Sequence, residues 1–222
     1  AGFSMAFWYE ATEYAANDRV VDWQDSGPAA GFTVIQNITG GQPLLRFQAN
    51  NGGSQTTNSL IGHLIPGISY HVMIIHDGTA VTLYVNNVQT ATDSSAVFTD
   101  AAATLTIGKR SGGSNLFKGK IGQFVLHNGT QWTAQQRSDL FNGGVVPSGV
   151  TVHYDFNDNV TDQSGNGNNG TLTGAVYITQ NMEPKLVTSG TNKALNFSKT
   201  SGAKITVTAD ADITLRTTGE FT

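Results

Sequence analysis

Cysteine is absent from this 222-residue chain, and several kinds of site are absent with it. A disulfide framework, a zinc site with thiolate ligands and a cysteine nucleophile are all excluded. Extracellular animal domains of this size depend heavily on disulfides, so a bacterial or phage protein fits the composition better.

Charged residues and long apolar runs are also scarce. Only 13% of the residues are charged, and 12 basic against 16 acidic residues give a formal net charge of −4. Lys and Arg form no block, so the sequence predicts no nucleic-acid binding. No apolar run approaches the roughly 18 residues that span a bilayer, and residues 1–10 lack the basic start of a signal peptide, so we expect no membrane insertion and a mature or excised segment.

Alternating apolar residues and tight-turn pairs fill the chain instead. In FSMAFWYE (3–10), large apolar residues occupy every second position, which is the period of a β-strand. Residues 69–92 contain Asp-Gly at 77–78 and Asn-Asn at 86–87 between β-branched runs. Both pairs tolerate the positive φ of hairpin turns, so this stretch predicts a three-strand antiparallel meander.

One short helix is expected near 133–143. Thr133 is a suitable N-cap with Gln136 three residues later, Leu140 supplies an apolar anchor, and Gly143 is placed as the residue after the helix. Strand patterns resume after Pro147. The predicted fold class is therefore all-β, a two-sheet antiparallel β-sandwich with one short helix.

Four stretches resemble the laminin-G-like, concanavalin A-like jelly-roll family of lectins and glucanases. Residues 105–129 (LTIGKRSGGSNLFKGKIGQFVLHNG) and 133–144 (TAQQRSDLFNGG) resemble the final third of such a domain. Residues 154–174 (YDFNDNVTDQSGNGNNGTLTG) resemble its first third, and 3–10 resemble a strand from its middle. The resemblance implies a jelly roll whose parts occur in rotated order.

The rotated order divides the chain into two portions. Residues 1–148 resemble the C-terminal two-thirds of one sandwich, and 149–222 resemble its N-terminal third. A circular permutant, a tandem array cut in mid-domain, or the exchange of 149–222 with a neighbouring subunit would each produce this order. The sequence leaves the three arrangements open.

Oxygen-bearing side chains are dense between residues 155 and 168. Calcium prefers carboxylate, amide and carbonyl oxygens, and the family resemblance implies a structural calcium ion near the rim of the sandwich. We predict Asp162 as the first Ca²⁺ ligand, with Asp158, Asn166 and Asn168 beside it. The alternative is that these residues shape left-handed and Asx turns.

Sugar binding is the function that the resemblance implies most directly. It calls for aromatic platforms beside amide and carboxylate groups. Trp8 lies opposite the apolar face of 3–10, and Trp23 lies in VDWQDSG beside Asp22, Gln24 and Asp25, so these five residues are the predicted glycan contacts. The alternative for both tryptophans is burial.

Catalytic patterns are missing. The carboxylate run of glycosidases on this fold does not occur, and only Asp210 and Asp212 have a spacing of two. His71 and His76 are five residues apart on one predicted strand, so they point to opposite faces and are expected to be structural. We expect a protein that is not an enzyme.

Two functional classes remain open. As a binding module, the domain would hold glycans or surface proteins from an extracellular, cell-surface or virion position. As a structural subunit, it would build a fibre, filament or coat by sharing the 149–222 segment between neighbouring copies. A glycoside-active enzyme is the third alternative.

Overall fold

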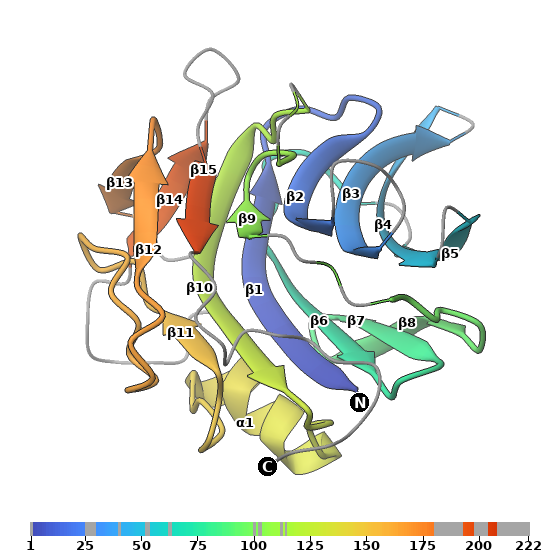
Figure 1. The fold of residues 1–222 in the computed structure, drawn as a ribbon. Helices are drawn as coiled ribbons and strands as arrows, with labels where there is room; N and C mark the ends of the chain where they lie inside the picture. Colours follow the sequence, from blue (N-terminus) through green and yellow to red (C-terminus); the bar gives the residue numbers. More distant parts are fainter. Residues whose placement is uncertain are drawn as a thin grey trace.

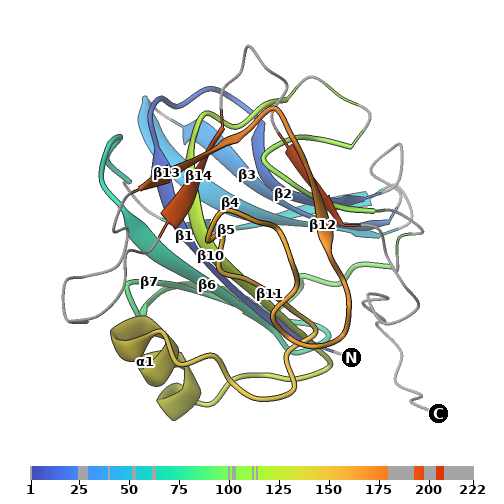
Figure 2. The same ribbon diagram turned by 90° about the vertical axis from the view of Figure 1, so that its left-hand side faces the viewer.

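The chain folds into two antiparallel β-sheets stacked face to face, with one helix in the described part (Figure 1 and Figure 2). A computed structural model describes residues 2–24, 30–39, 41–51, 54–61, 64–99, 101, 104–111, 113, 115–179, 193–197 and 204–207. The predicted all-β sandwich with a short helix is confirmed.

Sheet A contains eight strands of the described chain. They are β1 (Phe3–Ala11), β6 (Tyr70–His76), β7 (Val81–Val85), β8 (Val88–Asp93), β10 (Gly119–Asn128), β11 (Val152–Tyr154), β13 (Val176–Thr179) and β14 (Lys193–Phe197). Their order is β13-β14-β10-β1-β6-β7-β8, and β11 also pairs with β10. The predicted meander is β6-β7-β8, and its second turn places Asn86 and Asn87 at φ of 50° and 62°.

Sheet B contains seven strands of the described chain. They are β2 (Asp18–Gln24), β3 (Gly31–Thr39), β4 (Gln42–Asn51), β5 (Ser54–Ile61), β9 (Leu105–Ile107), β12 (Gly170–Thr173) and β15 (Lys204–Val207). Their order is β12-β15-β9-β2-β3-β4-β5.

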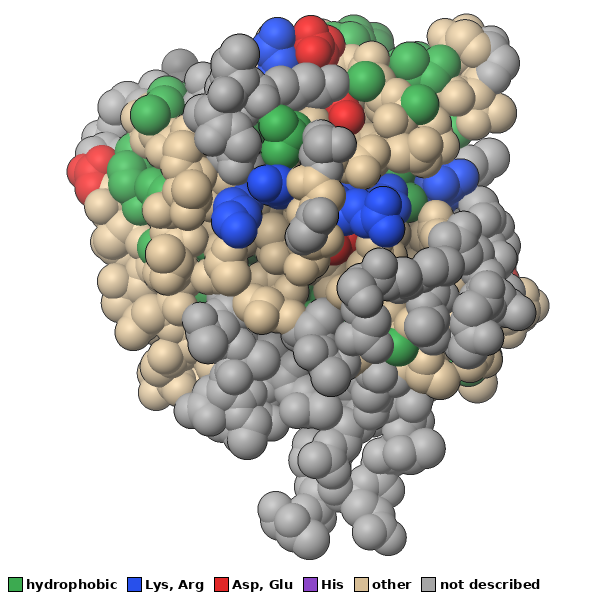
Figure 3. Space-filling view, turned by 45° about the horizontal axis from the view of Figure 1, so that its top comes forward, with side chains coloured by type: hydrophobic (Ala, Val, Ile, Leu, Met, Phe, Trp, Pro, Cys, Tyr) green, Lys and Arg blue, Asp and Glu red, His purple; other side chains and the backbone are tan. Residues whose placement is uncertain are grey.

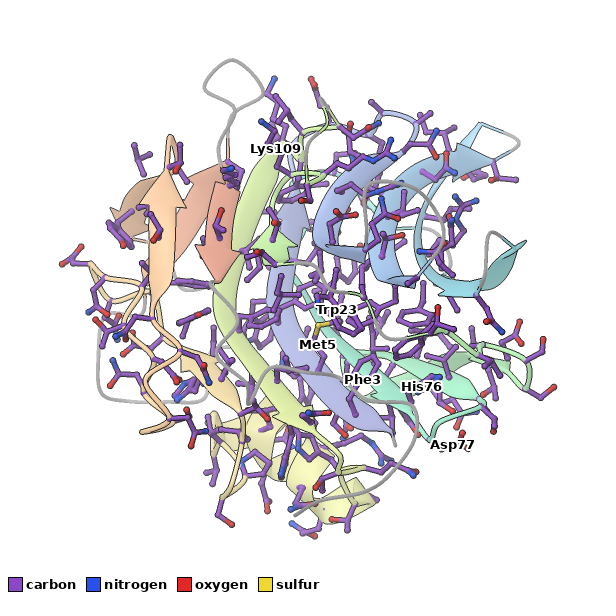
Figure 4. All side chains as sticks on the ribbon, in the orientation of Figure 1. Phe3, Met5, Trp23, His76, Asp77 and Lys109 are labelled. Carbon is purple, nitrogen blue, oxygen red and sulfur yellow. The ribbon has the colours of Figure 1, made fainter. Side chains whose placement is uncertain are left out.

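An aromatic core lies between the two sheets. Because side chains alternate along a strand, each sheet turns one apolar face inward. Phe3 of sheet A stacks on Phe32 of sheet B with ring centroids 4.9 Å apart. Figure 4 shows Phe3 in this interior with Met5, Trp23 and His76. Burial of each large apolar side chain stabilises the fold by roughly 1.5–3 kcal/mol, so this core is the main source of stability.

Helix α1 (Ala134–Gly143) covers the outer face of sheet A (Figure 2). Thr133 and Gln136 form the expected capping box, whereas the residue that ends the helix in the left-handed conformation is Gly144, one position later than predicted. Leu140 packs with Trp132 in a small apolar cluster on this face. The helix therefore closes the side of sheet A that faces away from sheet B.

Strands from the 149–222 segment lie inside both sheets of this same chain. β14 lies between β13 and β10, and β15 lies between β12 and β9. The Phe197 ring packs 6.0 Å from the Phe117 ring, centroid to centroid. The portions 1–148 and 149–222 thus share one sandwich here. The choice among permutant, tandem array and strand exchange stays a prediction, because all three arrangements make the same strand contacts.

Candidate binding face of sheet B

The two tryptophans predicted as sugar platforms are buried, and that prediction is wrong. Trp8 is 3% exposed and Trp23 is 1% exposed. Trp8 does lie opposite the core face of β1, but helix α1 covers it, with the Phe141 ring centroid 6.1 Å away. Trp23 lies in strand β2 and not in a loop, and its ring points into the core toward Phe32.

Asp22 and Gln24 point away from the core, because they flank Trp23 in a strand with a period of two. They join polar side chains from neighbouring strands on the outer face of sheet B. We call this surface the polar face; its members are Arg19, Asp22, Gln24, Thr33, Arg46, Gln48, Asn50, Thr106, Thr171 and Thr206. The predicted partner Asp25 lies outside the described residues.

Strand register arranges the polar face in rows across the sheet. The first row runs through Thr171, Thr206, Thr106, Asp22, Thr33 and Gln48, each directly opposite the next. The second row runs through Arg19, Ile35 and Arg46. Thr171 is exposed and Thr206 is partly exposed, whereas Asp22 and Thr33 are buried. Thr106 and Gln48 are buried as well, so the accessible part of the first row is its end at β12 and β15.

Hydrogen bonds link the amides of this face into a chain. Arg46 Nη2 donates to Gln48 Oε1 at 3.2 Å, and Gln48 Nε2 donates to Asn50 Oδ1 at 3.3 Å. Asn50 Nδ2 then donates to Gln24 Oε1 at 3.3 Å. Alternating donors and acceptors hold these side chains in fixed orientations, and Gln24, Gln48 and Asn50 are buried.

Other polar atoms of this face have no hydrogen-bond partner in the described part of the chain. They are Thr33 Oγ1, Asp22 Oδ1, Arg19 Nε and Arg46 Nε. Arg19 Nε and Asp22 Oδ1 are 3.4 Å apart, so they form an ion pair whose alignment does not make a hydrogen bond. An unpaired buried polar atom costs about 1–3 kcal/mol, so Thr33 Oγ1 and Arg46 Nε, which have neither a hydrogen bond nor an ion pair within the described part of the chain, favour a bound polar group.

Asp22 is the acidic member of the two rows, and its side chain is fully buried. Burial raises the pKa of its carboxyl to about 6, although a hydrogen bond from the Ser111 N–H and the charges of Arg19 and Arg110 act in the opposite direction. Burial also lowers the pKa of Arg46. Carboxyls with strongly shifted pKa values gather at functional sites, which supports this face as the candidate site.

The loop after β9 contacts strand β2 on the polar face. Ser111 N–H donates to Asp22 Oδ2 at 2.9 Å, which brings the preceding Arg110 close to Asp22. Figure 4 shows Lys109 at the start of this loop, at the rim of the sandwich. Lys and Arg side chains gather in a belt on the face drawn in Figure 3. None of the positions in the two rows is aromatic.

The predicted calcium residues form a hydrogen-bonded turn. Asp162 Oδ1 accepts hydrogen bonds from the N–H groups of His153 and Ser164, and Asp162 Oδ2 accepts from Ser164 Oγ and the Asn168 N–H. Burial raises the pKa of the Asp162 carboxyl, but these hydrogen bonds outweigh it and leave the pKa below its ordinary value. Four donors stabilise this carboxylate as a cation would, which disfavours Asp162 as the first calcium ligand.

The other calcium candidates have separate contacts. Asn166 and Asn168 both donate through Nδ2 to the Thr151 carbonyl oxygen, and Asp158 is an exposed turn residue at φ of 60°. Among the described residues, no three His, Asp or Glu side chains are grouped closely enough to hold a metal ion. Calcium binding stays a prediction, and the contacts that the structure shows are those of the alternative, turn-forming role.

Both predicted structural histidines are buried on opposite faces of β6. His76 packs on Phe3, with ring centroids 5.5 Å apart, and His71 packs on Trp8, with ring centroids 4.8 Å apart. Burial lowers the pKa of His71 to about 3, so this ring is neutral. Asp210 and Asp212 lie outside the described residues.

Sequence reasoning missed Arg46, Gln48 and Asn50. The signal is present in LLRFQAN, where these residues alternate with Leu45, Phe47 and Ala49, the pattern of a strand with one polar face. Their place beside Asp22 depends on strand pairing across β3, which the local pattern does not contain.

Residues 1–136 match the concanavalin A-like lectin/glucanases superfamily. The chain belongs to this family. Two solved structures have a similar fold. A chain assigned as a carbohydrate binding protein from Bacteroides ovatus is 19% identical with a TM-score of 0.51, covering 70% of this chain and 46% of that one. The enzymatically active domain of tailspike protein 2 from bacteriophage CBA120 is 12% identical with a TM-score of 0.53, covering 72% and 27%.

This lectin/glucanase-type chain therefore spans less than half the length of either structure. Among curated protein sequences, none matches it. In the described part of the chain, no helix is long and apolar enough to cross a membrane.

Proposed function

We propose that this domain binds carbohydrate on the polar face of sheet B and catalyses no reaction there. The observation that carries the proposal is the first row, in which hydroxyl, carboxylate and amide groups from six strands are aligned in register. Sugar hydroxyls both donate and accept hydrogen bonds, and so do the hydroxyls of Thr171 and Thr206 at the accessible end of this row. Membership of the lectin/glucanase superfamily supports the proposal.

An extracellular or virion-surface location is part of the same proposal. Two of the solved structures with a similar fold are a chain assigned as a carbohydrate binding protein and a phage tailspike domain, and both descriptions suit a protein that meets glycans outside a cell. Glycans, and surface proteins that carry them, are the proposed partners.

The accessible end of the first row provides the test. Thr171 and Thr206 lie directly opposite one another in β12 and β15. The double substitution Thr171→Val and Thr206→Val removes two hydroxyls and keeps the side-chain shape, so the fold should be retained. Each neutral hydrogen bond contributes about 0.5–1.5 kcal/mol, so binding of the best ligand from a glycan array should weaken roughly fivefold or more.

Sheet A offers a matched control. Thr82 and Thr92 form the corresponding cross-strand pair in β7 and β8, with one side chain exposed and one partly exposed. Thr82→Val with Thr92→Val should leave glycan binding unchanged. Equal binding by both double variants and the unmodified protein would place the sugar elsewhere.

Assembly through the 149–222 segment is the second proposed function. β14 and β15 are interior strands of the two sheets, so a copy that received them from a neighbour would be joined to it along both sheets. Light scattering on a size-exclusion column measures the native mass. Species larger than the 23.5 kDa chain would support exchange or repetition, and a monodisperse particle of that mass would support a closed permutant.

A further inference from the structure

Three arginines gather where the two rows of the polar face meet the loop after β9. Arg19 and Arg46 lie in the same row with Ile35 between them, so their backbones are two strand spacings apart, about 10 Å. Burial lowers the pKa of Arg19, the charge of Asp22 raises it, and the charges of Arg110 and Arg46 lower it further. The three guanidinium groups therefore form one basic cluster, which we call the arginine cluster.

The positive charge of this cluster is only partly balanced. Asp22 is the ion-pair partner of Arg19, and burial raises the pKa of that same carboxyl to about 6. The Arg19 side chain is 9% exposed, and its Nε atom faces the Asp22 carboxylate without hydrogen-bond alignment. Arg46 Nε has no hydrogen-bond partner in the described part of the chain. Buried guanidinium donors without acceptors are costly, and an anionic oxygen would satisfy them.

The exposure of the cluster gives an anion access. Arg46 and Arg110 are both partly exposed, whereas Arg19 lies buried behind them. Guanidinium groups bind carboxylate and sulfate oxygens through paired N–H donors, a geometry that Lys does not reproduce.

We propose that the carbohydrate held by the polar face is acidic, with a carboxylate or sulfate group bound by Arg46 and Arg110. This inference rests on the proposed function. Arg19 positions the cluster from behind, and the row of hydroxyls and amides contacts the neutral part of the saccharide. The absence of aromatic residues from the rows fits this division, because charge takes the role that ring stacking has in the recognition of neutral sugars.

The test uses a glycan array with matched neutral, carboxylated and sulfated saccharides, followed by calorimetry on two pairs: methyl-esterified galacturonan with galacturonan oligomers, and dextran with dextran sulfate oligomers. We expect binding of a charged member to exceed that of its neutral partner. Preference for galacturonan assigns a carboxylate ligand, and preference for dextran sulfate assigns a sulfate ligand.

Variants then assign the preference to the cluster. Arg46→Gln and Arg110→Gln should each weaken binding of the preferred acidic saccharide roughly tenfold or more, since hydrogen bonds to charged groups are the strong ones. Arg46→Lys and Arg110→Lys should each bind this saccharide more tightly than the corresponding glutamine variant and more weakly than the unmodified protein. Arg137→Gln, which removes the same charge from helix α1 on the opposite sheet, should have no effect. Melting temperatures confirm that each variant is folded.

Other outcomes separate the two proposals. Equal binding of neutral and charged members, or a preference that survives both glutamine variants, would overturn the acidic ligand and leave the sugar-binding face in place. Binding of no saccharide on the array would overturn the proposed function itself, and the acidic ligand with it.

Discussion

The hydroxyl of Tyr9 donates a 2.8 Å hydrogen bond to Gln36 Oε1, across the core from sheet A to sheet B. Gln36 Nε2 in turn donates to the Glu13 carbonyl oxygen at 2.6 Å. One buried amide thus ties β3 to β1 and to the loop that follows β1. This contact links the two sheets across a largely apolar interior.

Tyr9→Phe should destabilise the protein by about 1–2 kcal/mol, because it leaves the buried Gln36 Oε1 without its donor. Urea denaturation followed by tryptophan fluorescence measures the change. Tyr84→Phe is the control, since Tyr84 is a partly exposed tyrosine on sheet A. Equal stability of the two variants would mean that the hydrogen bond between the sheets contributes nothing.

Gly108→Ala should reduce the stability more than Tyr9→Phe, because Gly108 packs against a residue of the 149–222 segment. Its φ is 86°, and a Cβ atom there would lie 2.3 Å from Cδ1 of Phe197, a residue of the 149–222 segment. Backbone strain and overpacking together predict a loss of about 2–4 kcal/mol. Gly41→Ala is the matched control, since Gly41 has a φ of 77° and open space around its Cβ position.

The difference between these two glycine variants isolates the contact with Phe197. If Gly108→Ala cost no more than Gly41→Ala, Phe197 would not pack against β9 in solution. If the loss depended on protein concentration, the Phe197 ring would come from a neighbouring copy.

Asp22→Asn should change how stability depends on pH. The folded pKa of about 6 lies above the ordinary value of 3.8, so between these values the folded state keeps a proton that the unfolded chain releases. Stability of the unmodified protein should therefore fall as pH rises through this window, by roughly 3 kcal/mol for the full difference. The variant lacks this dependence, so its relative stability should rise between pH 4 and pH 7 in denaturation curves.

If the difference in free energy of unfolding between Asp22→Asn and the unmodified protein stayed constant from pH 4 to pH 7, Asp22 would have an ordinary pKa in the folded state. The charges that face this carboxyl are those of Arg19 and Arg110. Loss of its negative charge should also strengthen binding of an acidic saccharide at neutral pH, which calorimetry would detect.

Asp162→Asn should have the opposite dependence on pH. The folded pKa of Asp162 is below its ordinary value, so its stabilisation is complete above the unfolded pKa and is lost as pH falls through the folded one. Replacement removes charged hydrogen bonds from His153, Ser164 and Asn168, and should cost about 2–4 kcal/mol at pH 7 and less at pH 3. Asp155→Asn, in a more exposed Asx turn, is the control and should cost less.

Calcium binding at the turn around Asp162 can be tested by its effect on the melting temperature. Because four protein donors already surround the Asp162 carboxylate, we expect the melting temperature to be equal in EDTA and in millimolar calcium. A higher melting temperature in calcium that is abolished by Asp158→Asn would restore calcium binding at this loop through Asp158.

Local patterns in the sequence were sufficient for the meander of β6-β7-β8, for the helix near 133–143 and for the all-β class. In each case the information lies within a few residues: the Asn-Asn pair sets a hairpin turn, and Thr133 with Gln136 sets a helix start. The resemblance to the lectin/glucanase family also followed from local stretches, and the family match confirms it.

The tertiary structure decided which way the Trp23 side chain points and which residues lie beside Asp22. A period of two places neighbours on opposite faces, but it does not say which face is covered. Once β2 pairs with β3 and β9, Trp23 enters the core and Asp22 joins Thr33 and Thr106. The sequence by itself determined the elements and their family; only the packing of distant strands decided which side chains form the polar face, because register is a property of pairs of strands.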